Sequence, residues 1–313
     1  MAFNSILNKI FNLFILRRME GINQFIEHPI ETQQRVLFSL LSQAKNTEYG
    51  KLHHFEEIKS YEDFNKQVPI VSYEGFEPFI EKARQGNPDV FWPGKIKHFA
   101  KSSGTTNAKS KFIPISDESL QNCHYKAGKD LLAIYINNHR DSNLFKFKNL
   151  RLGGSAELYE SFGTKFGDLS AILIENLPFW VERTTTPSRE VSLMSEWETK
   201  LKAIVSEVKN KDVGSLTGVP SWMMVLLQRV LKDTGKKSIS EVWPNLEVFF
   251  HGGISFVPYR EQYKQLIGKD IRYYEIYNAS EGFFGIQDRF GSDEMLLMLD
   301  YGIFYEFIPM DTF

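Results

Sequence analysis

Apolar positions in the first 50 residues recur at intervals of three and four, which predicts a helical N-terminal segment over residues 1–50. Pro29 can open one of these helices, because its fixed backbone angle suits a first turn. Near the start, the apolar run Ile10–Leu16 has Lys9 before it and Arg17 after it, and Asn12 interrupts it. The run is too short for a secretory signal. We interpret it as an amphipathic helix of a cytoplasmic protein, with attachment to a membrane surface as the alternative.

Helices and strands alternate along the rest of the chain. Four further helices are indicated by their end residues, namely the cap Ser116, the capping box Ser195–Glu198, the pair Pro220 and Gly235, and the pair Pro258 and Gly268. Between the helices lie β-rich runs at Lys111–Ile115, Leu169–Ile174, Leu246–Phe250, Ile271–Tyr277, Met295–Leu299 and Ile303–Ile308. This alternation predicts an α/β fold.

The composition narrows the classes of function. The 313 residues carry 37 Lys and Arg against 39 Asp and Glu, a net charge of −2, so no bulk basic field attracts nucleic acid. The single cysteine, Cys123, excludes a disulfide framework and a cysteine-based zinc site. No run approaches the ~18 apolar residues that a membrane span needs.

A loop rich in hydroxyl groups precedes the strand predicted at Lys111–Ile115. It contains Ser102, Ser103, Gly104, Thr105 and Thr106, and Lys111 closes it. A glycine turn exposes backbone N–H groups, the hydroxyls add donors and the lysine adds charge, which together suit a polyphosphate. On composition alone, a solvated turn between two strands explains the loop better. The spacing of a P-loop is absent.

Two further segments follow predicted strands, at the edge where open α/β sheets bind ligands. Tyr277 offers a stacking ring, Ser280 a donor to phosphate, and Glu281 a hard oxygen ligand for Mg²⁺. Gly252 and Gly253 let the backbone approach a flat ring closely. An ordinary turn is the alternative interpretation for both segments.

An apolar helix start lies between these motifs. Val219, Pro220, Trp222 and Met223 can form the wall of an acyl pocket, and a plain core helix is the alternative. Cys123 falls on the predicted buried face of its helix, which favours a structural role. Zinc-protease, nucleophile-elbow and dinucleotide-binding signatures are absent from the sequence.

Taken together, the order and spacing of these elements resemble the acyl-adenylate-forming superfamily. Within it they are most similar to the acyl-acid amido synthetases, the auxin- and jasmonate-conjugating family of plants, which has bacterial members. The family's three nucleotide motifs resemble Ser102–Lys111, Tyr277–Glu281 and Tyr301–Pro309, and the resemblance runs from about residue 45 to the C-terminus. It implies a large N-terminal adenylation domain, built of mixed sheets flanked by helices.

The resemblance also implies a two-step ligase reaction that uses ATP and Mg²⁺. A small carboxylic acid attacks the α-phosphorus of ATP, pyrophosphate leaves, and an amine or amino acid then attacks the acyl-adenylate to form an amide. By this resemblance Ser102 to Thr106 and Lys111 would hold the β- and γ-phosphates, and Gly252, Gly253 and Tyr277 would enclose adenine. Ser280 would bind the α-phosphate and Glu281 would bind Mg²⁺, so Lys111 and Glu281 are the catalytic candidates.

The family's small C-terminal domain follows its third motif. We therefore expect residues 1–313 to be an incomplete large domain without that small domain, and to be inactive in isolation. The expected partners are the acid and the amine, without nucleic acid or a membrane span, and we expect a monomer. Two alternatives stay open: an acyl-CoA or acyl-carrier ligase, and a non-catalytic nucleotide- or acid-binding module.

Overall fold

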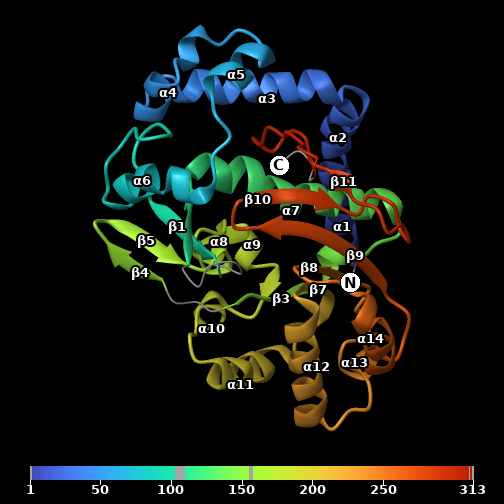
Figure 1. The fold of residues 1–313 in the computed structure, drawn as a ribbon. Helices are drawn as coiled ribbons and strands as arrows, with labels where there is room; N and C mark the ends of the chain where they lie inside the picture. The colour runs from blue at the N-terminus through green and yellow to red at the C-terminus, as the bar shows by residue number, and fades with distance from the viewer. Residues whose placement is uncertain (1, 103–109, 155–157, 310, 312–313) are drawn as a thin grey trace.

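The computed structural model describes residues 2–102, 110–154, 158–309 and 311. A seven-stranded sheet with helices on both faces forms the centre, and a four-stranded sheet lies beside it (Figure 1). The predicted α/β fold, with mixed sheets flanked by helices, is confirmed. None of the helices in the described residues combines the length and the apolar character needed to cross a membrane.

The N-terminal 50 residues are helical, as their periodicity predicts. They form α1 (Ala2–Leu16), α2 (Arg18–Glu27), α3 (Pro29–Ala44) and α4 (Glu48–Leu52). Thr47 caps α4, because its hydroxyl accepts the N–H of Gly50 at 3.0 Å. The turn η1 (Phe55–Glu57) and the helices α5 (Tyr61–Gln67) and α6 (Tyr73–Arg84) then lead to the first strand.

The large sheet has the strand order β11-β10-β9-β8-β7-β3-β6. Its strands are β3 (Lys148–Leu152), β6 (Thr185–Thr186), β7 (Val213–Gly218), β8 (Val248–Gly252), β9 (Arg272–Ala279), β10 (Gly282–Ile286) and β11 (Leu296–Leu297). The five strands from β6 to β9 in this order run parallel, and β10 and β11 are antiparallel additions. The chain leaves β3 toward β6 on one side and continues through β7, β8 and β9 on the other. A topological switch point therefore lies between β3 and β7.

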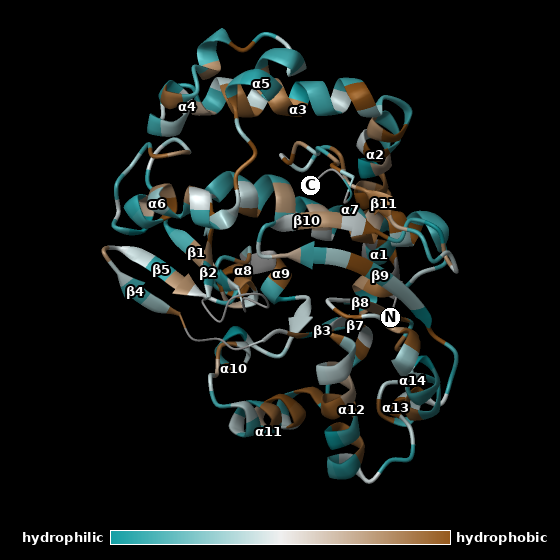
Figure 2. Ribbon diagram, in the orientation of Figure 1, coloured by the Kyte–Doolittle hydropathy of each residue, from teal (hydrophilic) through white to brown (hydrophobic). Residues whose placement is uncertain are grey.

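Helices cover both faces of this sheet. The helical segments after α6 are η2 (Ser119–His124), α7 (Tyr125–Asn138), η3 (Leu144–Lys146), α8 (Leu169–Glu175), α9 (Phe179–Glu182), α10 (Arg189–Ser192), α11 (Trp197–Val208), α12 (Pro220–Thr234), α13 (Ile239–Val242), η4 (Val257–Tyr259) and α14 (Arg260–Ile267). Phe249 packs in the core under α11 to α14, whereas its neighbours Val248 and Phe250 pack in the core under α1, α2 and α7. Alternate residues of β8 thus supply two separate cores. Helices such as α3 and α11 alternate between hydrophobic and hydrophilic residues, as amphipathic helices do (Figure 2).

The small sheet has the order β2-β1-β5-β4. Its strands are β1 (His98–Ser102), β2 (Lys111–Ile115), β4 (Tyr159–Ser161) and β5 (Thr164–Gly167). Strands β1 and β2 are antiparallel, with Ser102 opposite Lys111. The hydroxyl-rich loop therefore joins the two strands of a hairpin, and Ser103, Gly104, Thr105 and Thr106 lie outside the described residues.

Two of the predicted strands are wrong. The run 169–174 forms helix α8, which buries Ala171, Ile172 and Ile174. An apolar run of this length suits a buried helix as well as a strand, and periodicity cannot separate the two. The run 303–308 pairs with no strand of the described residues. Its backbone is held instead by Gln33 of α3, whose amide donates to the carbonyl of Ile303 at 3.0 Å and accepts the N–H of Tyr305 at 2.8 Å.

The predicted helix ends are mostly confirmed. Helix α12 begins at Pro220 and ends at Gly235, which takes the left-handed backbone with φ +66°. Ser116 accepts the N–H of Ser119 at 3.0 Å, as a cap should. The capping box at Ser195–Glu198 is wrong in its details. Glu196 caps α11, because its carboxylate accepts two of the N–H groups that the first turn leaves free, those of Glu198 and Thr199.

Candidate nucleotide and acyl site

The carboxyl ends of four parallel strands meet at one edge of the large sheet. Leu152 at the end of β3 is level with Gly218 at the end of β7, and Gly218 is in turn level with His251 of β8. Gly252 is paired with Ile276 of β9, one residue before Tyr277. The motifs predicted from the sequence at Val219, Gly252 and Tyr277 therefore end three neighbouring strands, and Val219 lies next to the switch point of the sheet.

Glycine is required at both positions at the end of β8, for two different structural reasons. A Cβ on Gly252 would lie 2.4 Å from the carbonyl oxygen of Ile276, so a side chain here would push β8 and β9 apart. Gly253 has φ +84°, which other residues rarely adopt, and a Cβ there would lie 3.4 Å from Val219 Cγ2. Gly252 is needed for strand pairing, and Gly253 turns the chain toward the start of α12.

The four candidate acyl-wall residues divide into two pairs. Pro220 and Met223 are buried, and Met223 packs in the core under α11 to α14. Val219 is half-buried, and Trp222 is 42% exposed. Trp222 lies over the exit from β3, since a Cβ on Gly154 would be 3.3 Å from its indole ring. A ligand at this edge would meet Val219 and Trp222, with Met223 supporting them from behind.

The motif Tyr277–Glu281 forms the end of a hairpin. Strand β9 continues to Ala279, and Ser280 and Glu281 make the turn into β10. The ring of Tyr277 is 57% exposed and packs on Phe284 of the next strand, with ring centroids 5.1 Å apart. Glu281 is exposed, and its carboxylate has no hydrogen bond or ion pair with the described residues. It is therefore available to a ligand.

Lys111 is oriented by a residue to which the sequence assigned no role. Its ammonium lies 5.0 Å from the ring centroid of Tyr73 at the start of α6. The hydroxyl of Tyr73 accepts the N–H of Phe112 at 2.9 Å, so the ring is fixed against β2. A cation held over an aromatic face keeps its charge and loses freedom of movement. The only sequence signal for Tyr73 was its place in a segment that resembles the family.

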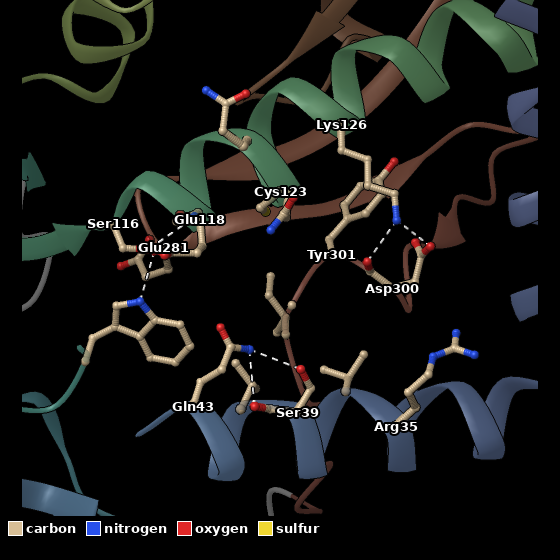
Figure 3. Close-up of a pocket in the computed structure, with 18 of the residues that line it drawn as sticks. Arg35, Ser39, Gln43, Ser116, Glu118, Cys123, Lys126, Glu281, Asp300 and Tyr301 are labelled. Atoms are coloured by element: carbon tan, nitrogen blue, oxygen red, sulfur yellow. Dashed lines mark hydrogen bonds and ion pairs between the residues drawn. The ribbon is translucent and has the colours of Figure 1, made fainter. Parts of the chain in front are cut away.

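A cavity of about 780 Å³ opens beside the hairpin turn. Glu281, Ser116 and Glu118 lie at one end of it, and Asp300, Tyr301 and Lys126 lie at the other (Figure 3). Its far wall is α3, with Arg35, Ser39 and Gln43. Lys111, Val219 and Trp222 do not line this cavity. The cavity thus includes Glu281 of the hairpin turn but no residue of the candidate acyl wall.

The third motif begins in a buried polar network beside this cavity. Tyr301 donates its hydroxyl to Asp130 at 2.9 Å, and Asp130 also accepts from Arg18 at 2.5 Å. Burial raises the pKa of Asp130, against the opposing effects of Arg18 and Tyr301. Lys126 pairs with Asp300 next to Tyr301. These partners tie the third motif to α2 and α7.

The histidine before the glycine pair is enclosed by aromatic rings. His251 stacks on Phe256 with ring centroids 4.2 Å apart. Burial lowers the pKa of His251 to about 3, so the imidazole is neutral at physiological pH. A neutral, enclosed ring serves packing here rather than proton transfer.

A profile of the GH3 family N-terminal domain matches residues 18–271, which is more than half of the chain. The chain belongs to the GH3 family. The indole-3-acetic acid-amido synthetase GH3.2 of Arabidopsis thaliana is 28% identical over 106 residues, covering 34% of this chain and 19% of that protein. The jasmonoyl–L-amino acid synthetase JAR6 of Nicotiana attenuata is 34% identical over 90 residues, covering 28% of this chain and 16% of that protein.

The GH3 fold extends over most of this chain. A solved structure of the GH3.15 acyl acid amido synthetase superposes with a TM-score of 0.71 at 15% identity, covering 90% of this chain and 59% of that one. The two chains therefore share the same fold. This GH3 chain therefore spans a little over half the length of that structure and matches shorter segments of the two plant relatives.

Lys200 is a buried cation of this GH3 chain that the sequence did not indicate as part of the site. Lys200 of α11 is 2% exposed, and its ammonium donates to the carbonyl of Gly154 at 2.8 Å. Ser170 accepts the N–H of the same glycine at 3.2 Å. Both contacts fix the exit of β3 beneath Trp222. A lysine inside an amphipathic helix gives no sequence signal for such a role.

Proposed function

We propose that this protein is an ATP-dependent acyl-acid amido synthetase. A carboxylate attacks the α-phosphorus of ATP and expels pyrophosphate, and an amine, such as that of an amino acid, then displaces AMP to form an amide. Membership of the GH3 family supports the proposal, as do the amido synthetases among its relatives. The observation that carries it is the convergence of Val219, Gly253 and the Tyr277–Glu281 hairpin at one edge of the sheet.

The residues act by binding and orienting the reactants. Lys111 supplies positive charge to the β- and γ-phosphates, together with the loop that starts at Ser102. Tyr277 stacks on adenine beside Gly252 and Gly253, and Ser280 donates to the α-phosphate. Val219 and Trp222 contact the acyl group, with Pro220 and Met223 behind them. No protein nucleophile is needed, because charge neutralisation and alignment lower the barrier.

Glu281 is the proposed ligand for Mg²⁺. Its carboxylate is exposed, lies on a hairpin turn and is free of partners in the described residues, which suits a metal shared with phosphate oxygens. No cluster of three His, Cys, Asp or Glu side chains is found in the described part of the chain. A magnesium ion here would therefore depend on the nucleotide for most of its ligands. When bound, it neutralises charge that develops on the phosphate.

The test is ATP–pyrophosphate exchange by the full-length product of the gene with a panel of carboxylic acids, followed by product analysis with amino acids and with coenzyme A. Exchange that depends on one class of acid, followed by amide formation, supports the proposal. A thioester as the only product would instead identify an acyl-CoA ligase. Nucleotide binding without exchange for any acid would identify a non-catalytic binding module.

A further inference from the structure

The first helix, α1, has polar side chains on the side that faces the protein and apolar side chains on the side that faces away from it. The side of α1 that faces the protein holds Asn8 and Asn12, both buried. The opposite side holds Ile6, Ile10, Leu13 and Phe14, which are 59%, 54%, 69% and 66% exposed. These four residues follow one another at helical spacing and form one stripe, which we call the outer stripe. An ordinary surface helix has the opposite arrangement.

The inner side of α1 is attached by specific hydrogen bonds. The side-chain amides of Asn8 and Asn12 donate to the carbonyl of Ser142 at 3.1 and 3.3 Å, and Asn8 accepts the N–H of Phe145 at 3.2 Å. Ile15 adds an apolar contact to the core under α7. Asparagine buried in this way fixes which side of the helix faces inward. The outer stripe is therefore held outward by the fold.

The charged side chains of α1 and of the residue that follows it are positive. Residues Ala2–Leu16 contain no Asp or Glu. Lys9 lies beside the stripe and Arg17 directly follows the helix, and both are exposed. Arg18 is occupied by its ion pair with Asp130. A second copy of the same surface would bring these cations together, which disfavours self-association through this face.

We infer that the outer stripe of α1 binds the surface of an anionic phospholipid bilayer. Isoleucine, leucine and phenylalanine side chains would enter the boundary between headgroups and acyl chains, while Lys9 and Arg17 contact lipid phosphates. At 15 residues, with one side bonded to the protein, α1 is placed to lie along a surface. It precedes residue 18, where the match to the GH3 family begins, so this contact is independent of the proposed reaction.

The test is flotation of the purified 313-residue chain with lipid vesicles. We expect binding to vesicles of phosphatidylcholine mixed with phosphatidylglycerol, little binding to phosphatidylcholine alone, and weaker binding at high salt. The variant Ile10→Ser/Leu13→Ser/Phe14→Ser should bind at least about tenfold more weakly. The variant Lys9→Glu/Arg17→Glu keeps the stripe and should lose at least about tenfold on anionic vesicles.

The matched control is Leu52→Ser/Ile70→Ser/Val257→Ser, which removes three exposed apolar side chains elsewhere. It should bind vesicles as the unaltered protein does. Failure of the unaltered protein to float with anionic vesicles would overturn the inference, and so would an equal loss in the control. A dimer in solution that only the outer-stripe variant dissociates, without vesicle binding, would instead assign this face to a second copy.

Discussion

The ammonium of Lys200 donates a hydrogen bond of 2.8 Å to the carbonyl oxygen of Gly154. This bond joins the buried side of α11 to the turn that leaves β3, and the indole of Trp222 lies on the same glycine. Burial lowers the pKa of Lys200, because the surrounding protein solvates the ammonium less well than water. The bond therefore determines where one wall of the candidate acyl site stands.

Replacing Lys200 by methionine keeps the length of the side chain and removes the donor. We expect Lys200→Met to lower the free energy of unfolding by about 1–3 kcal/mol, because the Gly154 carbonyl is left unpaired. Lys202 lies two residues away on the exposed side of α11, and Lys202→Met should change stability by less than about 0.5 kcal/mol. Urea denaturation of both variants makes the comparison. Equal free energies of unfolding for the two variants would show that the hydrogen bond from Lys200 to Gly154 does not stabilise the fold.

Lys111 should matter through phosphate. Lys111→Ala is expected to weaken ATP binding about 10- to 100-fold, the effect of losing a charged hydrogen bond, with the fold retained. Lys101→Ala is the control, since Lys101 is exposed on the adjacent strand β1. Calorimetric titration with ATP measures both. An unchanged affinity in Lys111→Ala would mean that the loop does not bind the nucleotide.

Tyr73 should act through Lys111. Tyr73→Leu removes the aromatic face beneath the ammonium and should weaken ATP binding about 2- to 5-fold. Tyr73→Phe keeps the ring and loses only the hydrogen bond from Phe112, so its affinity should lie closer to that of the unaltered protein. If both variants lose the same affinity, the hydroxyl rather than the ring positions Lys111.

Glu281 should matter only when magnesium is present. Glu281→Gln keeps the shape of the side chain and removes the charge that binds the metal, so nucleotide affinity should lose its dependence on Mg²⁺. Glu118→Gln is the control, because Glu118 lines the same end of the cavity and accepts the indole N–H of Trp92 at 3.0 Å. Titration of ATP binding against Mg²⁺ distinguishes the two. Parallel responses in Glu281→Gln and the unaltered protein would leave Glu281 as a simple turn residue.

Two of the buried histidines, His124 and His251, predict how the free energy of unfolding responds to acid. Burial lowers the pKa of His124 to about 4 and that of His251 to about 3, from an ordinary value of 6.5. Below pH 6.5 these histidines take up protons in the unfolded chain but not in the folded protein. Their contribution to the free energy of unfolding is therefore fully present above pH 6.5 and is lost as the pH drops toward 4. Each histidine contributes a slope of about 1.4 kcal/mol per pH unit in this window.

Urea denaturation at several pH values between 7.5 and 4.5 measures this slope. His251→Leu removes one of these rings, so its slope should be shallower by about 1.4 kcal/mol per pH unit, whatever its absolute stability. An identical slope in the variant and the unaltered protein would show that His251 is protonated in the folded state.

The sequence was informative wherever the determinant is local. Pro220 and Gly235 mark both ends of α12, because a missing N–H and a left-handed backbone are properties of single residues. The strands that end at Gly252 and Ala279 were predicted from runs of β-branched and aromatic residues, and their ends meet because parallel neighbours share an edge. The placement of the candidate motifs follows from this geometry.

Contacts between distant residues could not be predicted. Gln33 holds the segment after Tyr301 from 270 positions away in the chain, and this replaces the strand pairing that the apolar run 303–308 suggests. The same is true of Lys200 with Gly154 and of Tyr73 with Lys111. In each case the partner is set by tertiary packing, and no spacing along the chain reports it.

The thiol of Cys123 accepts the N–H of Phe283 at 3.2 Å, which links the helix before α7 to the hairpin that carries Ser280 and Glu281. The chain has a single cysteine, which is 3% exposed at the edge of the cavity, and burial raises the pKa of its thiol, so a thiol reagent should react faster whenever helix and hairpin separate. The rate at which Cys123 is alkylated therefore reports how often the hairpin opens, and the native sequence needs no added label for this. A nucleotide that binds at the hairpin turn should lower that rate.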